Sequence, residues 1–210
     1  MDLSGWQKIY DELKGKNFEI IAAAQDTGGE AAAGEFYDQA KATYTTLIDT
    51  EHAISSLYHM NNVPSGVWIN ENGQMVRPVE PASVATRTLT LGDKAITTMG
   101  DTYVAALRDW VEKGAASDFA MTPEALRQHL KPRPAHEQEA DASFRLGIYF
   151  HKIGQRENAE KYWQHAQKLH PDSWNYHRQE WFFTPDEANK KWFSKFVQLG
   201  DDPYYPPLEM

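Results

Sequence analysis

Histidine and acidic side chains gather in the segment from Asp49 to His59. His52 and His59 lie seven residues apart, so a helix would place them on one face, with Asp49 and Glu51 close by. A metal site needs three or four convergent ligands, and this spacing is not an established zinc motif. The pattern therefore favours surface or helix-capping roles for these residues.

Two further groups of histidines have the same interpretation. The first lies at a linker and is typical of a solvated charge run: His129, His136, Glu137, Glu139 and Asp141. The second lies where a helix is expected to end and is explained by helix-end hydrogen bonds: His170, His177, Arg178 and Glu180. We therefore predict no metal site and no cofactor.

The sequence contains no motif for nucleophilic catalysis or phosphate binding. A Gly-x-Ser-x-Gly elbow and a Ser-x-x-Lys motif are both absent. Gly28 and Gly29 follow a predicted strand, but the further glycines and the lysine of a phosphate loop are missing, so a turn is expected. Because the chain has no cysteine, disulfides, thiolate zinc sites and thiol catalysis are excluded.

The composition is that of a globular protein with an acidic surface. The chain has 210 residues, 41% of them hydrophobic, and a formal net charge of -9 at pH 7. This balance, without a run of Lys or Arg, argues against nucleic acid and anionic membranes as partners. No apolar run approaches the roughly 20 residues of a membrane span, and the N-terminus lacks a basic-then-apolar signal pattern. We therefore expect a cytoplasmic protein.

The clearest structural pattern lies in residues 62–76. Residues 67–69 are a short β-prone run, Asn72 and Gly73 form a strong hairpin signal, and Gln74 begins the return strand. Pro64 comes just before the first strand, where a proline removes no ladder hydrogen bond. The segment predicts a β-hairpin entered through a proline turn.

Helices and strands alternate ahead of this hairpin. Apolar spacing predicts a helix over residues 3–13 and a buried strand over residues 18–26. A helix, a short strand and a second helix are then expected over residues 34–44, 45–49 and 52–60. The order predicts an α/β fold.

This arrangement, with its proline turn and Asn-Gly hairpin, resembles the thioredoxin fold of TlpA-like thiol-disulfide oxidoreductases and of the alkyl hydroperoxide reductase and thiol-specific antioxidant group. The resemblance implies that Pro64 is a cis-proline bordering a cleft formed with the first helix. Residues of that cleft are our predicted partner-binding residues: Val63, Pro64, Ser65 and Trp6.

Two parts of the family pattern are missing. In these redoxins a central strand and a Cys-x-x-Cys motif precede the first helix, whereas this sequence starts inside the corresponding helix and has no cysteine. The family's catalytic residues therefore cannot be carried over. The vacant central strand would lie between residues 19–24 and 67–69, so we expect direct pairing of these strands or a homodimer that closes the opening, and the aromatic excess favours the homodimer.

The rest of the chain predicts a connecting region and a helical unit. Residues 78–90 are expected to form a loop, and a closing helix from Asp101 to Gly114 completes a thioredoxin-like domain of residues 1–114 that lacks the redox-motif strand. Residues 115–134 contain a short helix that starts at Pro123, followed by a proline-rich linker.

Residues 135–210 resemble a tetratricopeptide repeat with an aromatic extension. Small and large residues recur at the offsets of that repeat: Leu146, Gly147, Phe150, Gly154, Ala159, Trp163, Ala166 and Pro171. Such units are stable in arrays of three or more, so a single repeat needs a cover. We expect one or two further helices with tail aromatics to supply it, one of them starting at Pro185, and residues 201–210 to lie extended on the surface.

Three functions follow from these patterns. The first is a redox-inactive, thioredoxin-like protein with a tetratricopeptide-like unit that binds a protein or peptide partner. The second is the C-terminal part of a thiol-disulfide oxidoreductase or peroxidase whose cysteines lie upstream of Met1. The third is a thioredoxin fold recruited as a metal-assisted ester or lactone hydrolase. The sequence leaves open whether the chain is an enzyme.

Overall fold

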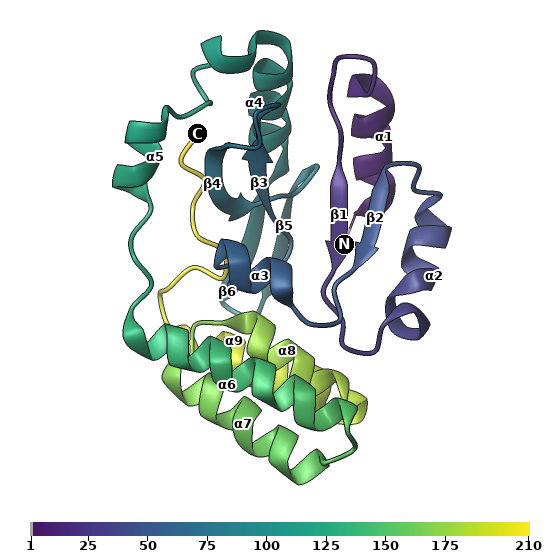
Figure 1. The fold of residues 1–210 in the computed structure, drawn as a ribbon, viewed down its shortest axis with the longest axis vertical. Helices are drawn as coiled ribbons and strands as arrows, with labels where there is room; N and C mark the ends of the chain where they lie inside the picture. Colours follow the sequence, from purple (N-terminus) through teal and green to yellow (C-terminus); the bar gives the residue numbers. More distant parts are fainter. Residues whose placement is uncertain (1) are drawn as a thin grey trace.

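The computed structural model describes residues 2–210 and shows a mixed α/β chain (Figure 1). Helices and strands alternate up to the third strand, four strands from the third to the sixth then follow one another, and helices alone make up the second half of the chain. In chain order the elements of the first half are α1 Leu3–Leu13, β1 Ile21–Ala24, α2 Glu30–Ala40, β2 Thr45–Ile48, α3 Ala53–Tyr58, β3 Ser65–Ile69, β4 Met75–Pro81, β5 Thr86–Leu91, β6 Lys94–Met99 and α4 Gly100–Lys113. A 3₁₀ turn over Gly114–Ala116 precedes α5 Pro123–His129, α6 Ala135–Lys152, α7 Arg156–Leu169, α8 Trp174–Phe182 and α9 Pro185–Gln198.

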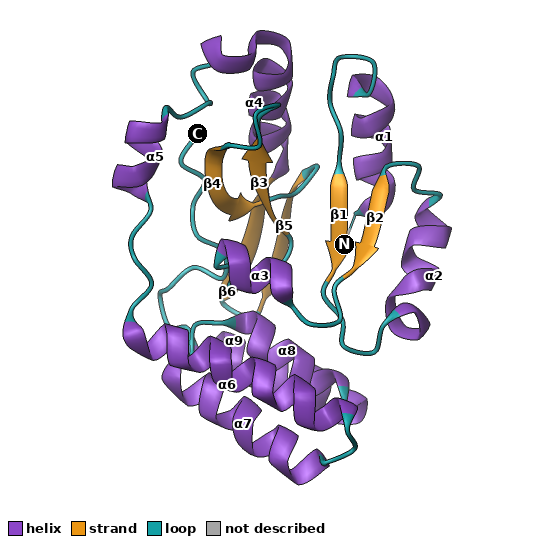
Figure 2. Cartoon of the chain, viewed as in Figure 1, coloured by secondary structure: helices purple, strands orange, loops and turns teal. Residues whose placement is uncertain are grey.

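The strands form three separate two-stranded sheets (Figure 2). β1 and β2 are parallel, and α2 connects them. β3 and β4 form the antiparallel hairpin expected from Asn72 and Gly73, and β5 and β6 form a second antiparallel hairpin. The arrows of β1 and β3 point in opposite directions in Figure 2.

Helices α1 and α4 form one layer beneath the first two sheets. α1 is joined to the β1/β2 side, because Gln7 exchanges hydrogen bonds with Thr43 and Tyr44 donates to the Leu3 carbonyl. α4 packs beneath β3, where the ring of Trp110 stacks on that of Trp68. One apolar cluster spans both helices and β3: Ile9, Leu13, Trp68, Ala82, Tyr103, Val104, Ala106 and Leu107.

Direct pairing of β1 with β3, one of the two expected ways to close the sheet, is wrong. Within residues 2–210, β1 pairs only with β2, and β3 pairs only with β4. The ion pairs of Glu12 with Arg108 and of Lys16, in the turn after α1, with Glu112 join α1 and this turn to α4 in the layer below. The β1/β2 and β3/β4 sheets therefore lie on the same layer of α1 and α4, but no main-chain pairing joins one sheet to the other.

The second half of the chain begins with a helical hairpin of α6 and α7. Its core contains Ala140, Phe144, Ile148, Ala159, Trp163 and Ala166, each at most 2% exposed. Gly147 allows the close approach, because a Cβ added there would lie 2.5 Å from Cδ1 of Trp163. Leu146 was expected in this core, and that prediction is wrong: its side chain is 37% exposed, because Phe144 and Ile148 occupy the inner face of α6.

The packed aromatic residues of the last two helices and the tail divide into two groups, while Phe182 and Phe193 are exposed. Tyr176 stacks on Phe144 and Phe183 stacks on Trp163, so these two cover the α6/α7 hairpin as expected. The others form a separate cluster with Ile96 of β6: Trp174, Trp181, Phe196 and Tyr204, with Trp192 packed against it. The tail was expected on the surface, but Tyr204 is only 8% exposed because it inserts into this cluster.

Most predicted elements exist, and three differ from the structure. The strand that was expected to be buried over residues 18–26 is β1 at Ile21–Ala24, and none of its four residues is fully buried. The helix expected over residues 34–44 is α2 at Glu30–Ala40, because the chain turns at Gly29, whose φ is 69°. The loop expected over residues 78–90 is wrong, since β4 continues to Pro81 and β5 starts at Thr86.

Candidate functional site

The predicted proline turn lies at the start of β3. The Val63–Pro64 peptide bond is cis, as expected. Val63, Pro64 and Ser65 are all half-buried, and the Ser65 hydroxyl donates to the Asn62 carbonyl at 2.7 Å. The C-terminal part of the chain contacts this turn, because Arg178 and the Tyr205 hydroxyl both donate to the Val63 carbonyl, at 3.2 Å and 3.1 Å.

Trp6, the fourth predicted partner-binding residue, is connected to the turn through Tyr103. The rings of Trp6 and Tyr103 make an edge contact with centroids 6.1 Å apart. The Tyr103 hydroxyl accepts from Nε1 of Trp68 at 2.9 Å and lies 2.8 Å from the position of a Cβ on Gly66. Burial raises the pKa of Tyr103 to about 12, so this hydroxyl is a neutral hydrogen-bonding group rather than a base.

The outer edge of β1 carries unused main-chain groups. The Ala24 carbonyl accepts from the Asp49 amide at 2.7 Å, so Ala24, and by strand alternation Ala22, point their main-chain groups towards β2. The amides and carbonyls of Ile21 and Ala23 consequently point the other way. No hydrogen bond to these groups occurs in the part of the chain that the structure describes.

The edge of β3 that faces away from β4 also carries unused main-chain groups. The Pro64 carbonyl accepts from Ala82, and the Asn70 amide donates to Gln74, so even-numbered residues of β3 point towards β4. Both register shifts of this hairpin place the extra residues on β4, which leaves the alternation of β3 regular. The main-chain groups of Ser65, Val67 and Ile69 therefore point away from β4.

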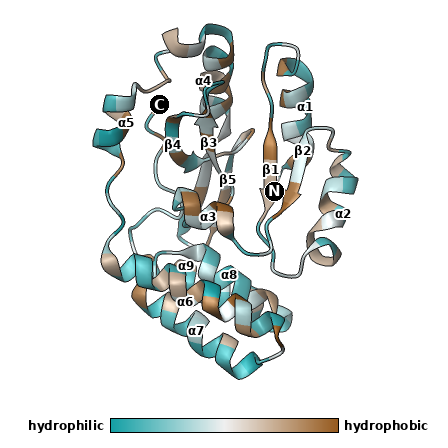
Figure 3. Cartoon of the chain, in the orientation of Figure 1, coloured by the Kyte–Doolittle hydropathy of each residue, from teal (hydrophilic) through white to brown (hydrophobic). Residues whose placement is uncertain are grey.

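We call the main-chain groups of Ile21 and Ala23 on β1, and of Ser65, Val67 and Ile69 on β3, the edge site. Both edges belong to strands that rest on the α1/α4 layer. β1 and β3 contain no charged residue, and Figure 3 colours β1 as hydrophobic. Ile21 nevertheless has 66% of its surface exposed. An uncharged strand with an open edge and an exposed apolar side chain is able to pair with another strand.

His52 forms a buried polar contact between the α/β part and α8. Its Nε2 donates to Oε1 of Gln179 at 2.7 Å, and the same oxygen accepts from the Thr27 amide at 3.1 Å. Burial lowers the pKa of His52, and the hydrogen bond to Gln179 and the charge of Asp49 partly oppose that shift. Asp49 accepts from the amides of Ala53 and Ile54 and thereby caps α3. These residues have capping and docking roles, as the sequence predicts for Asp49.

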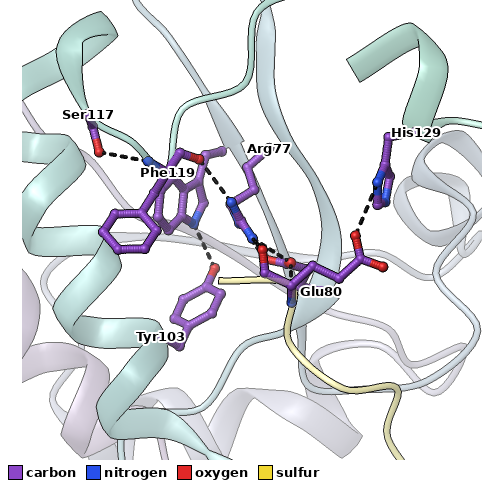
Figure 4. A network of polar contacts seen from close by, with 8 residues as sticks. Arg77, Glu80, Tyr103, Ser117, Phe119 and His129 are labelled. Atoms are coloured by element: carbon purple, nitrogen blue, oxygen red, sulfur yellow. Dashed lines mark hydrogen bonds and ion pairs between the residues drawn. The ribbon is translucent and has the colours of Figure 1, made fainter. Parts of the chain in front are cut away.

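Arg77 and Glu80 form a buried ion pair on β4 (Figure 4). Two hydrogen bonds of 2.6 Å and 2.8 Å join the guanidinium to the carboxylate. Arg77 also donates to the carbonyls of Phe119 and Glu209, at 2.9 Å and 2.7 Å. The Glu209 carboxylate lies 3.2 Å from His129 of α5. Through these contacts, the ion pair joins the C-terminal tail and the turn after α4 to the β3/β4 hairpin.

The other candidate residues are dispersed. Among residues 2–210, no group of three or more His, Asp or Glu side chains is positioned to hold a metal ion. His59 lies at the end of α3, and His129 lies on α5. Helices long and apolar enough to cross a membrane are also absent from the described residues.

Sequence reasoning predicted the proline turn and Trp6 as partner-binding residues and did not predict the residues of the edge site. The sequence did indicate the two strands that carry these edges, because the vacant central strand was expected between them. However, the sequence did not show that the edges stay unpaired. Comparisons of the chain with protein-family models, with curated proteins and with solved structures find no match.

Proposed function

We propose that this chain is a redox-inactive, thioredoxin-like binding protein that holds a partner protein through an extended segment. The segment adds as a β-strand between β1 and β3. The observation that carries this proposal is the edge site: two unpaired strand edges over a common α1/α4 floor. Main-chain hydrogen bonds on both sides supply affinity in strand addition, each with a net contribution of roughly 0.5 to 1.5 kcal/mol.

The composition supports binding rather than thiol chemistry. The chain has no cysteine, and the buried Tyr103 and Arg77 are committed to structural contacts. The proline turn contributes by fixing the start of β3, and Trp6 contributes through its contact with Tyr103. The α6/α7 hairpin, which we propose to be tetratricopeptide-like, supports this site through α8 and the tail.

A proline at position 67 tests the proposal directly. The Val67 amide points away from β4, so Val67→Pro keeps the β3/β4 ladder, removes one donor of the edge site and places a ring on its open side. Val67→Ala retains the amide and is the matched control. Peptides selected from a displayed random library against the full chain are the probes, and affinity is measured by fluorescence anisotropy.

We expect the selected peptides to bind Val67→Pro at least about tenfold more weakly than wild type, and Val67→Ala nearly as well as wild type. Circular dichroism and the urea midpoint check that both variants fold. Equal binding to Val67→Pro and wild type would show that the peptides attach elsewhere, and the proposal would fail. A library without any saturable binder would also contradict it.

A second candidate function uses the same edges. A strand covalently joined to the chain ahead of α1 would fill the edge site in cis, and the protein would then be part of a thiol-disulfide oxidoreductase or peroxidase. The unpaired edges of β1 and β3 favour this candidate as well. An in-frame Cys-x-x-Cys segment in the DNA upstream of Met1 is the result that would support it.

A further inference from the structure

We infer that α8 is an acid-sensitive clamp on the α/β part, and that the neutral imidazole of His52 is the group through which acid releases it. This inference goes beyond the proposed function and does not depend on what occupies the edge site. It rests on hydrogen bonds made by two neighbouring residues of α8 and on the tautomer that one of them imposes on His52.

α8 contacts both of the strands that carry the edge site. Gln179 accepts from the amide of Thr27, in the loop after β1. Its neighbour Arg178 donates to the carbonyl of Val63, just before β3. β1 and β3 run in opposite directions in Figure 2, so both contacts lie at the same end of this pair of strands. α8 therefore joins the end of β1 to the start of β3.

The Thr27 amide fixes the tautomer of His52. A main-chain N–H can only donate, so the Gln179 atom that it meets is the acceptor Oε1. The same oxygen lies 2.7 Å from Nε2 of His52, so this ring nitrogen carries a hydrogen. Nδ1 of the neutral ring therefore carries none. Nδ1 is buried, and no group of residues 2–210 makes a hydrogen bond with it.

Protonation of His52 disturbs this arrangement. The second hydrogen has to go to Nδ1, where it would be a buried donor without an acceptor. His52 is only 3% exposed, and its ring makes an edge contact with Phe144 of α6, with centroids 5.1 Å apart. A buried charge of this kind costs free energy, whereas water hydrates the imidazolium once α8 has moved away. Acid therefore favours the released form.

The charged groups that face His52 oppose this effect without cancelling it. They are the carboxylates of Asp49 and Glu51, just before His52 in the chain, and of Asp26, in the loop after β1. Asp49 already accepts from two amides of α3, and Glu51 forms an ion pair with Lys152 of α6. α8 contributes only an uncharged amide. Burial outweighs these charges and lowers the pKa of His52 in the clamped form.

The sign of the pH dependence follows from this difference. The released form takes up its proton near the ordinary pKa of about 6.5, and the clamped form takes it up only at lower pH. The balance between the two forms is therefore constant above about pH 6.5. Below that pH it shifts towards release, by at most about tenfold per pH unit for one proton.

Amide hydrogen exchange of the full chain measures this shift. Protection factors, which are corrected for the intrinsic effect of pH on exchange, are compared between about pH 7.5 and about pH 5. The Thr27 amide reports on the clamp, and the amides of α1 report on unfolding of the whole chain. In wild type the protection of Thr27 should fall by up to about tenfold per pH unit below about pH 6.5, and that of α1 should fall less.

Two variants separate His52 from the other histidines. His52→Gln keeps a side-chain donor for Gln179 but takes up no proton, so the protection of Thr27 should no longer depend on pH in this range. His177→Gln, on the same helix as Gln179, is the matched control. It retains His52 and should keep the wild-type pH dependence at Thr27.

Gln179→Glu is the sharper variant, because it should reverse the effect. Nε2 of Gln179 is buried without a hydrogen-bond partner among residues 2–210, so its replacement by oxygen removes no contact. The new carboxylate still accepts from the Thr27 amide and gives the imidazolium a counter-charge, which raises the pKa of His52. The protection of Thr27 should then be retained or increase as the pH falls to about 5. Imidazole NMR shifts measure the pKa of His52 directly.

The outcomes are distinct from those of the edge-site test. A fall at Thr27 in wild type that is absent in His52→Gln and Gln179→Glu supports the clamp. Equal pH dependence in wild type and both variants would overturn it, and so would an equal fall at Thr27 and α1, which would mean that acid unfolds the whole chain. If His52→Gln does not fold, Gln179→Glu alone decides. Peptide binding to Val67→Pro is unaffected by any of these results and still tests the proposed function.

Discussion

At the residue scale, the buried ion pair of Arg77 and Glu80 shows how buried charges are neutralised and hydrogen-bonded inside this chain. Both side chains are less than 10% exposed, and the guanidinium also donates to the carbonyls of Phe119 and Glu209. Its plane also lies over the Trp68 ring, 5.6 Å from the centroid. Because each of the three guanidinium nitrogens of Arg77 has a partner, the pair is stable only as a complete network.

Replacement of Glu80 by Gln should therefore be strongly destabilising. The variant leaves the Arg77 charge buried without its counter-charge, which costs roughly 3 to 5 kcal/mol of the free energy of unfolding. Urea denaturation followed by tryptophan fluorescence measures the loss. Glu124→Gln is the control, because Glu124 pairs with Arg127 at the surface, where such pairs contribute about 1 kcal/mol or less. Equal losses in the two variants would contradict a buried network.

His177 should make stability depend on pH. Burial, and then the charge of Lys195, lower the pKa of His177 to about 4, whereas the unfolded chain titrates near the ordinary value of 6.5. The unfolded state thus gains a proton first as pH falls. His177 therefore does not lower the free energy of unfolding above about pH 6.5. Between pH 6.5 and pH 4 it lowers that free energy by at most about 1.4 kcal/mol for each unit by which the pH falls.

The His177→Gln variant cannot take up this proton, so its stability should fall less between pH 6.5 and 4. Urea midpoints at several pH values measure the slope. His52 and His170, whose pKa values are also lowered by burial, leave a residual slope in the variant. An unchanged slope in His177→Gln would show that the pKa of His177 in the folded chain lies near its value in the unfolded chain.

At the element scale, local pattern predicted helices better than it predicted strands. Apolar spacing located α1, α4 and the α6/α7 hairpin, because a helix is specified by its own residues and end signals. The β5/β6 hairpin was missed, although Gly92-Asp93 between two threonine-containing runs is a recognised hairpin signal. The run rich in Pro, Ser, Thr and Ala ahead of it resembled a loop.

The candidate site was only partly predictable for a related reason. The proline turn is a local feature, and residues 62–76 predicted its place, whereas its cis bond was expected only from the resemblance to redoxins. Whether an edge is paired depends on a strand far away in sequence or in another molecule, so the open edges of β1 and β3 emerged only from the coordinates. The prediction of which face of α6 is buried was wrong for a similar reason. Leu146 and Phe144 are both apolar, and only packing decides which of them faces α7.

Gly147 tests the packing of the helical hairpin. Replacing a helical glycine by alanine ordinarily stabilises a protein by about 0.5 to 1 kcal/mol. Here the added Cβ would lie 2.5 Å from Cδ1 and Nε1 of Trp163, so Gly147→Ala should instead cost roughly 1 to 3 kcal/mol through overpacking. Gly34→Ala in α2 is the control, because its Cβ meets only the flexible Glu30 side chain, at 3.1 Å. Stabilisation by both substitutions would show that α6 and α7 are further apart.

At the scale of the whole molecule, polar contacts join the α/β part to the helical part at several buried points. Asn175 of α8 donates to the Met60 carbonyl at 2.6 Å, and Gln179 binds the Thr27 amide and His52. The tail then continues across the α/β part, past β4 towards α5, and is drawn in yellow in Figure 1. Unpairing such buried groups costs free energy, so the two parts are expected to unfold together.

Tyr204 is the residue through which this coupling is best tested. Its ring packs against Trp174, Trp192 and Phe196, its carbonyl accepts from Asn62 at 3.1 Å, and its hydroxyl accepts from Arg178. Tyr204→Ala should lower the free energy of unfolding by roughly 3 to 5 kcal/mol, the range for deletion of a large buried aromatic. Because the two parts are joined, amide hydrogen exchange should accelerate in β3 as well as in α8 and α9.

Tyr205→Phe is the matched control for this prediction, because it removes only the hydroxyl that donates to the Val63 carbonyl and should cost about 1 kcal/mol. Faster exchange confined to α8, α9 and the tail in Tyr204→Ala would contradict the coupling and would make the helical part an independent unit. Faster exchange at Trp68, whose amide points towards β4, would instead link the tail to the strand that carries the edge site. Occupancy of that site by a partner strand should then protect α8 in return, because coupling between two parts of one molecule is reciprocal.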